Sequence, residues 1–186
     1  MARRHREILD TLLERIVDGR YPVGSLLPKE ESISEEFDVS RGTGREALRA
    51  LEERRVAVVR HGRGAIVQPP EAWNVLDPVV AAALSRGRRR RKFLEEVEEL
   101  RGALRAEAAG LAAARATARQ RETLGTGGDG DTWTLVVEAA QNRPLAAALR
   151  TLAELAPAAA DRGSPELAAA VAGGDVDAAR AAARRG

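Results

Sequence analysis

Residues 39–64 have the sequence VSRGTGREALRALEERRVAVVRHGRG, and this stretch decides the fold. Ser40 can cap a helix by accepting a backbone N–H from its first turn, so we predict a helix that continues to about Arg54. At about 100° per residue, one side of this helix carries small and apolar residues, namely Gly44, Ala47, Leu48 and Leu51. Another side carries Arg41, Arg45 and Arg49, so one side is predicted to pack and the other to face outward.

Two short β-prone runs follow this helix, at residues 56–60 and 65–68. They flank His61, Gly62, Arg63 and Gly64, and a glycine-rich turn between β-prone runs is typical of a β-hairpin. The glycines would let the backbone and a cation approach a phosphate ridge or a minor groove. The sequence therefore predicts a basic wing directly after the arginine-bearing helix.

The chain before residue 39 supplies two more predicted helices. Apolar residues recur at helical spacing from Ile8 to Ile16, which predicts an amphipathic first helix. Glycine and proline then interrupt the pattern, and a second helix is predicted from about Lys29 to Phe37. Only residues 38–40 separate it from the third helix, so the pair is a helix-turn-helix candidate.

The arginines of this region suit DNA. Arginine can donate two hydrogen bonds to O6 and N7 of guanine, or it can bind phosphates. Arg41 and Arg45 lie at the amino end of the third helix, which is the end that helix-turn-helix proteins direct at base edges. Thr43 offers a hydroxyl to phosphate or a methyl to thymine. Residues 40–64 contain seven Arg and three Glu, without Lys or Asp. The competing interpretation is a solvated face whose arginines neutralise those glutamates.

Beyond the wing, Pro69 and Pro70 predict a domain boundary. We predict a DNA-binding domain over 1–70, a segment over 71–92 with one helix and a basic run, and a helical domain over 93–186. That last domain is expected to contain a long helix over 93–119, a glycine-rich loop at 125–130, and helices over 133–140, 145–155 and 165–184. The fold class is therefore mainly α.

Composition excludes several classes of protein. The chain of 186 residues has a net charge of +2 and no cysteine, so it has neither a disulfide framework nor a thiol metal site. Residues 1–20 are charged throughout, and no apolar run approaches the roughly 20 residues of a membrane span. We therefore expect a cytoplasmic protein. An enzyme is disfavoured because the second half lacks histidine, a phosphate-cradling glycine loop and an obvious carboxylate pair.

The first half closely resembles the DNA-binding domain of GntR-family regulators. The resemblance rests on residues 39–51, on RHGRG at 60–64, on DGRYPVG at 18–24 and on Leu27-Pro28, and it covers about residues 6–68. It implies a winged helix that binds a palindromic operator as a homodimer. The family's DNA-contact positions fall on Arg41, Thr43, Arg45, His61 and Gly62, to which the helical and wing patterns add Arg49 and Arg63.

Three residues depart from that family's pattern. Glu31 stands where a DNA-contacting arginine is usual, which replaces one phosphate contact with repulsion. Arg55 replaces a glycine after the third helix, at a position where a positive φ would suit glycine. Gly44 replaces a usual valine, which costs about 1 kcal/mol in helix propensity.

Several pieces of the chain match another family pattern in the right order, namely Trp73, Leu76-Asp77-Pro78, residues 96–101, residues 111–117, and AAQN at 139–142 with Leu145. On these pieces the second half resembles the FadR-type, or FCD, branch of the same family, in a shortened and degenerate form. Members of that branch hold a divalent metal with one Asp and three His below a carboxylate effector. The resemblance places Asp129 at the acid position and Trp133, Ser164 and Gly186 at the histidine positions. Because indole cannot ligate such a metal and serine and glycine are poor substitutes, we predict no metal cofactor. Arg101 matches a carboxylate-facing position, although a surface charge paired with Glu98 is an alternative.

Two hypotheses follow. The first is a dimeric DNA-binding regulator, more often a repressor in this family, whose helical domain dimerises and responds to an organic acid. The second is a helical ligand-binding or protein-interaction module that has lost operator binding, for which Glu31 and Gly44 are the support. The two differ in whether the protein binds duplex DNA with strong salt dependence.

Overall fold

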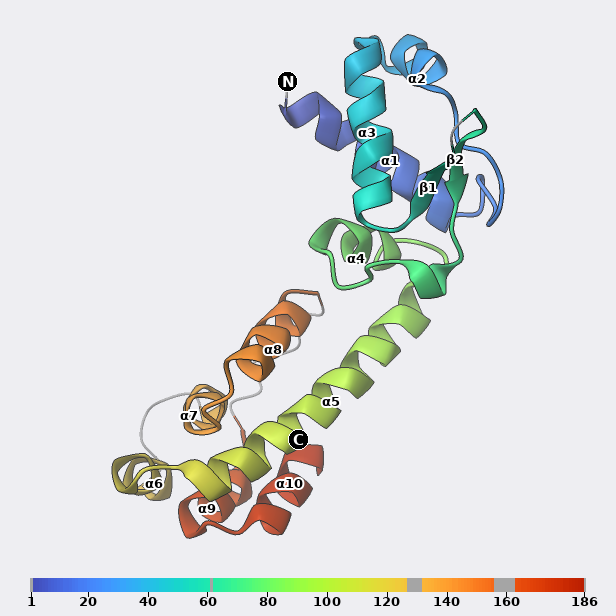
Figure 1. Ribbon diagram of the computed structural model, residues 1–186. Helices are drawn as coiled ribbons and strands as arrows, with labels where there is room; N and C mark the ends of the chain where they lie inside the picture. Colours follow the sequence, from blue (N-terminus) through green and yellow to red (C-terminus); the bar gives the residue numbers. More distant parts are fainter. Residues whose placement is uncertain (1, 61, 127–131, 156–162, 186) are drawn as a thin grey trace. The chain divides into compact units, whose positions relative to one another are not determined.

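The computed structural model describes residues 2–60, 62–126, 132–155 and 163–185. The chain divides into two compact units, Met1–Phe93 and Leu94–Gly186. The described residues form helices and one two-stranded antiparallel sheet (Figure 1), which confirms the mainly α fold class. None of the described helices is both long and apolar enough to cross a membrane.

The first unit is a winged helix-turn-helix followed by one further helix. Its elements are α1 (Ala2–Val17), α2 (Glu30–Phe37), α3 (Arg41–Glu53), β1 (Ala57–Arg60), β2 (Gly64–Val67), a short 3-10 helix η1 (Pro70–Ala72) and α4 (Pro78–Leu84). The two strands pair with Ala57 opposite Val67 and Arg60 opposite Gly64. The predicted three helices and hairpin are thus confirmed.

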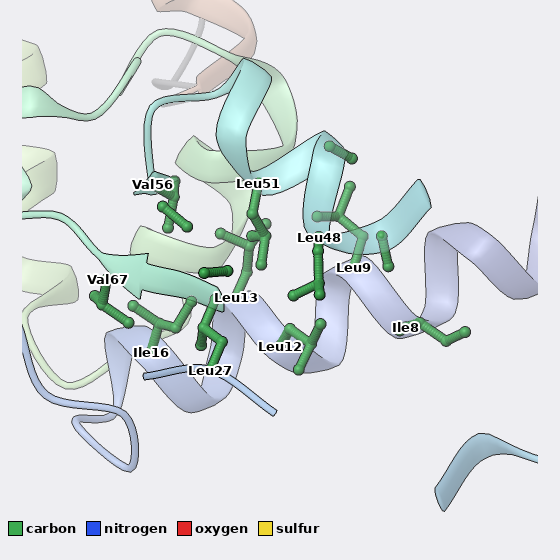
Figure 2. Packing of buried hydrophobic residues seen from close by; sticks show 14 of the residues in the cluster. Ile8, Leu9, Leu12, Leu13, Ile16, Leu27, Leu48, Leu51, Val56 and Val67 are labelled. Carbon is green, nitrogen blue, oxygen red and sulfur yellow. The ribbon is translucent and has the colours of Figure 1, made fainter. Parts of the chain in front are cut away.

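The core of this unit forms around the apolar stripe of α1. The stripe is almost completely buried and consists of Ile8, Leu9, Leu12, Leu13 and Ile16. It belongs to the same buried cluster as Leu48 and Leu51 of α3, as Val56 just before β1 and as Val67 of β2 (Figure 2). Burial of each large aliphatic side chain stabilises the folded state by about 1.5–3 kcal/mol, so this shared cluster fixes the position of α3 relative to the wing.

Local hydrogen bonds fix the turn between α2 and α3. α2 ends at Asp38, whose left-handed backbone (φ 49°) directs its N–H to the carbonyl of Ser34. The Ser34 hydroxyl donates to the carbonyl of Val39. Ser40 then caps α3, its Oγ accepting from the N–H of Thr43 at 3.2 Å. The predicted cap is confirmed, and it sets where the arginine-bearing helix begins.

The first unit continues past the predicted boundary at Pro69-Pro70. Trp73, Val79 and Val80 are buried in the same core as α1, and the indole N–H of Trp73 donates to the carbonyl of Gln68 at 2.9 Å. α4 packs against α1. The prolines therefore interrupt secondary structure without ending the buried cluster, and the unit extends to Phe93.

The second unit is helical in its described residues, and buried alanine side chains form much of its core. They are α5 (Arg90–Arg115, which begins in the last residues of the first unit), α6 (Ala118–Gly125), α7 (Thr132–Ala139), α8 (Arg143–Leu155), α9 (Pro165–Gly173) and α10 (Val176–Arg185). Fully buried alanines on α5 and α10 share one cluster with Trp133 and Val136. Small side chains allow close helix packing, which suits a chain with few aromatic residues.

Two of the predicted helices are each divided in two. The helix predicted over 165–184 consists of α9 and α10, because Gly174, with a φ of 76°, ends α9. The helix predicted over 93–119 ends at Arg115. A separate helix, α6, follows it and continues to Gly125, the first residue of the predicted loop. Thr117 and Gln120 cause the break by forming a capping box, in which each side chain accepts from the other residue's backbone N–H. Arg121 then ties α6 to the ends of two neighbouring helices by donating to the carbonyls of Ala113 and Val171. Most of the predicted loop at 125–130 lies outside the described residues.

Candidate nucleic-acid interface

The third helix has the two faces that its sequence predicts. Its packing face, Gly44, Ala47, Leu48 and Leu51, is buried in the first unit. Arg41, Arg45 and Arg49 are exposed on successive turns. A row of exposed guanidinium groups on a helix that is anchored by its other face has the shape and charge needed to enter a major groove.

The three arginines differ in their ion pairs. Arg41 lies 3.6 Å from the carboxylate of Glu31 on α2, and Arg49 lies 3.9 Å from that of Glu46. Within the described part of the chain, Arg45 has no carboxylate within 4.0 Å. Exposed pairs of this kind contribute about 0–1 kcal/mol, so DNA could displace them. Of these three arginines, Arg45 is therefore the one that has no described carboxylate beside it.

Thr43 lies between these arginines in the first turn of α3. Its Oγ1 is 2.9 Å from the Oγ of Ser40, and its own N–H donates to that oxygen. The side chain is only half-buried. Either hydroxyl can donate in this contact, and in both cases Thr43 Oγ1 keeps a lone pair that can accept from a further donor without leaving the helix cap.

The wing has the turn that its glycines predict. Gly62 and Gly64 have φ values of 73° and 95°, in the left-handed region that favours glycine. Arg63 between them is exposed, and its N–H donates to the carbonyl of Arg60 at 2.9 Å. His61 lies outside the described residues. The Glu52 carboxylate accepts from the N–H of Val59 at 2.9 Å, which ties the wing to the end of α3.

Gly44 marks a close approach of α2 and α3. A Cβ built on this glycine would lie 2.9 Å from the carbonyl oxygen of Glu30 and 3.4 Å from Cγ2 of Ile33. The departure from the usual valine is therefore a packing feature, because a larger residue would collide with the backbone of α2. The sequence alone indicated only that this glycine lowers the helix propensity, and it gave no sign of the close approach to α2.

Arg55 adopts the conformation that its position in the resemblance predicts. Its φ is 59°, and its N–H donates to the carbonyl of Glu52 at 2.8 Å. A non-glycine residue in this region costs about 1–2 kcal/mol. The arginine therefore strains the backbone slightly just after α3.

A brace joins α1 to α2. Arg15 donates through two nitrogens to the carboxylate of Glu36, and its guanidinium lies 5.7 Å from the ring centroid of Phe37. These hydrogen bonds hold the pKa of Glu36 below its usual value, against a smaller desolvation effect. They also raise the pKa of Arg15. The pair therefore positions the carboxyl end of α2 relative to α1.

The carboxyl end of α3 is joined to α4 by a pair that sequence reasoning missed. Arg54 Nε lies 3.1 Å from Asp77 Oδ1, and both side chains are about four-fifths buried. Arg54 also donates to the carbonyl of Ala50, while Asp77 caps α4 by accepting from the N–H groups of Val79 and Val80. The Asp77-Pro78 dipeptide was the available signal, because Asp before Pro commonly starts a helix.

The second unit holds the residues predicted from the metal-binding branch. Trp133 is buried in the core of that unit, with the guanidinium of Arg105 4.5 Å from its ring centroid. Ser164 caps α9 by accepting from the N–H of Leu167 at 3.2 Å. Asp129 and Gly186 lie outside the described residues. Across the ranges that the structure describes, no three His, Asp or Glu side chains cluster in a way that could hold a metal.

Arg101 is buried, whereas the alternative interpretation from the sequence was a surface charge paired with Glu98. It does pair with Glu98, one turn earlier on α5, but only 7% of the residue is exposed. The side chain is therefore a buried charge held by a carboxylate. Helical periodicity alone could not show this, because the burial depends on what packs over that turn of α5.

Comparisons with known proteins find similarity to bacterial regulatory proteins. The model for bacterial regulatory proteins of the gntR family matches residues 4–67. An uncharacterized HTH-type transcriptional regulator of Mycobacterium tuberculosis is 38% identical over 117 residues, 63% of this chain and 47% of that protein. The galactonate operon transcriptional repressor of Escherichia coli is 36% identical over 110 residues, 59% of this chain and 48% of that protein. A solved structure, Streptococcus agalactiae GntR, matches over 97% of this chain and 95% of that one with 23% identity and a TM-score of 0.43.

The chain spans about half the length of the two curated relatives. Both alignments are longer than the segment matched by the family model, so the similarity extends beyond the wing.

Proposed function

Because residues 4–67 form a helix-turn-helix domain of the gntR family of bacterial regulatory proteins, we propose that this chain is a sequence-specific DNA-binding transcriptional regulator. The observation that carries the proposal is the exposed row of Arg41, Arg45 and Arg49 on a helix whose other face is buried. The first turn of α3 would meet base edges, and the wing at Gly62 and Arg63, with His61, would meet the adjacent phosphates or minor groove.

The regulator acts as a homodimer on a palindromic operator in the cytoplasm. Two recognition helices must lie about one helical turn apart to enter successive major grooves, so two-fold symmetry of the protein matches a palindrome in the DNA. Repression follows when the bound dimer occludes a promoter, and the similarity to a galactonate operon repressor supports that sign of regulation. The protein carries out no chemical reaction in this mechanism.

The helical second unit supplies dimerisation and the response to an effector, as an FCD-like domain. An effector can change DNA binding only by binding more tightly to one dimer geometry than to another. The buried Arg101 is the candidate partner for a carboxylate, since a charge that is already desolvated can exchange its partner Glu98 for an anionic ligand. Trp133 and Ser164 have structural roles in the core and at a helix cap, so this response uses no metal of the family's type.

The alternative of a protein-interaction module that has lost operator binding is less well supported. Gly44 lies on the buried face of α3, where it packs against α2, so it leaves the exposed arginines on the other face in place. Glu31 reduces the positive charge at one point but leaves Arg45 unpaired with any described carboxylate. The alternative still makes a distinct prediction, which is the absence of salt-sensitive binding to duplex DNA.

The test selects binding sites from a random duplex library with the purified full chain. The affinity for the selected site and for a random duplex is then measured by fluorescence anisotropy over a salt series. Arg45→Ala should weaken binding to the selected site about tenfold to a hundredfold, because a bidentate base contact contributes about 1–3 kcal/mol. Arg119→Ala, which removes an exposed arginine of α6, is the matched control and should change little. Selection of no preferred sequence, together with equal behaviour of the two variants, would refute the proposal.

A further inference from the structure

Glu31 and Arg41 meet at the edge of the candidate interface. Glu31 lies in the first turn of α2, Arg41 is the first residue of α3, and their charged groups are 3.6 Å apart. The Arg41 side chain is 73% exposed and that of Glu31 is 48% exposed. An ion pair this exposed contributes little to folding. Its position, at the end of α3 that would face DNA, suggests that it acts in binding.

Helix packing holds the two residues together independently of the ion pair. Gly44 lies one turn into α3, and at this glycine the backbone of Glu30 comes within the distance that a Cβ would occupy. The first turn of α2 therefore lies directly against the first turn of α3. Since Glu31 follows Glu30 in the chain, the close approach at Gly44 brings its carboxylate beside Arg41.

The charges near Arg41 favour a base over a phosphate. The amino end of α3 carries the positive end of the helix dipole, which by itself attracts an anion and disfavours a cation, and the Glu31 carboxylate offsets both effects. A phosphate that approaches Arg41 must displace or lie beside that carboxylate, and the two anions repel each other. Guanine O6 and N7 are neutral acceptors. The guanidinium has five donors in a planar fork, so it can keep the carboxylate on one edge and donate to guanine from another.

We propose that Glu31 is a specificity-determining residue, which directs Arg41 to a guanine edge and makes its use as a phosphate contact unfavourable. The proposal rests on the DNA-binding function proposed above and adds how discrimination is obtained. Glu31 lowers the affinity for DNA of any sequence more than it lowers the affinity for the selected site. The chain thereby exchanges one nonspecific contact for a larger ratio of specific to random binding.

Glu31→Gln tests this, because it removes the charge and keeps the size of the side chain. We expect random-duplex affinity to rise about threefold to tenfold at low salt. The slope of log K against log[salt] should steepen by about 0.9, the value for one additional phosphate contact. The ratio of selected-site to random affinity should fall, and a parallel selection should show a weaker guanine preference at one position in each half-site. These changes should vanish when Glu31→Gln is made in an Arg41→Ala background.

Glu46→Gln is the matched control, because Glu46 is an exposed glutamate that pairs with Arg49 on the same interface. If both substitutions raise the affinity for random and selected DNA equally, or if the Glu31 effect persists without Arg41, the residue acts only through total charge and the inference is wrong. If the wild-type chain shows no salt-sensitive duplex binding, the proposed function fails and the inference fails with it. Those two results are distinguishable, because the first requires a wild type that binds.

Discussion

Substitution of Gly44 by alanine tests the close approach of α2 and α3. Helix propensity alone predicts that the alanine stabilises the protein by about 1 kcal/mol, because glycine is the poorer helix former. The structure predicts a loss, because the new Cβ would lie 2.9 Å from the carbonyl oxygen of Glu30. That oxygen belongs to the backbone of the first turn of α2, which cannot turn aside as the end of a flexible side chain could.

Gly42 provides the control that isolates the steric part of this change. It lies on the same helix, and a Cβ at Gly42 would meet only the Ser40 hydroxyl, at an ordinary contact distance of 3.6 Å. Both substitutions gain a similar propensity, so the difference between them is the cost of overpacking. That cost is typically about 1–3 kcal/mol in a packed site. We therefore expect Gly42→Ala to gain up to about 1 kcal/mol and Gly44→Ala to lose about 1 kcal/mol.

Urea denaturation of the full chain measures the difference. Trp73 is buried in the core of the first unit, so a Trp133→Phe background leaves one indole whose fluorescence reports the unfolding of that unit. A thermal measurement should separate the two alanine variants by roughly 8–16 °C, at about 4–8 °C per kcal/mol for a domain of this size. If Gly44→Ala is stabilised as much as Gly42→Ala, α2 does not approach α3 this closely. In that case packing at Gly44 would not hold Glu31 beside Arg41.

Three further predictions concern other parts of the chain. Arg55→Gly should raise the free energy of unfolding by about 1 kcal/mol in urea titrations, because Arg55 has a φ of 59°; a destabilised variant would show that its side chain contributes more than the backbone costs. Glu36→Gln should flatten the loss of stability as pH falls below about 4.5, the usual pKa of glutamate, because Arg15 lowers the pKa of Glu36 in the folded state and the resulting stability disappears as pH falls through that lowered pKa; a curve parallel to the wild type would contradict this. EDTA should leave the thermal midpoint unchanged, because Trp133 occupies a histidine position of the metal-binding branch; a fall of several degrees would reveal a metal.

The features predicted correctly from sequence are mostly short-range. The stripe of α1, the cap at Ser40 and the glycines of the wing each depend on residues within a few turns of one another. Helical period, capping and positive φ are local physical constraints, so they can be recognised in a sequence before any tertiary contact is known. They were sufficient for the winged helix and for the outward face of its third helix.

The predictions that failed had competing local signals. Thr117 and Gln120 form a capping box that begins α6, although the surrounding alanines also favour one continuous helix. Pro69 and Pro70 predict an interruption, and the structure has one, but the buried core continues to Trp73 and beyond. Proline stops a helix or strand by removing a donor and restricting φ, and neither effect prevents later residues from packing into the same core.

The sequence by itself therefore determined which side chains of α3 are outward-facing arginines and where that helix begins. Only the tertiary structure decided what those arginines meet. The pairing of Arg41 with Glu31 and of Arg54 with Asp77 joins residues from different helices, as does the contact between Gly44 and the backbone of Glu30. Periodicity assigns a residue to a face of its own helix. The distance between two helices depends on the side chains at their crossing, and it becomes defined only when the core packs.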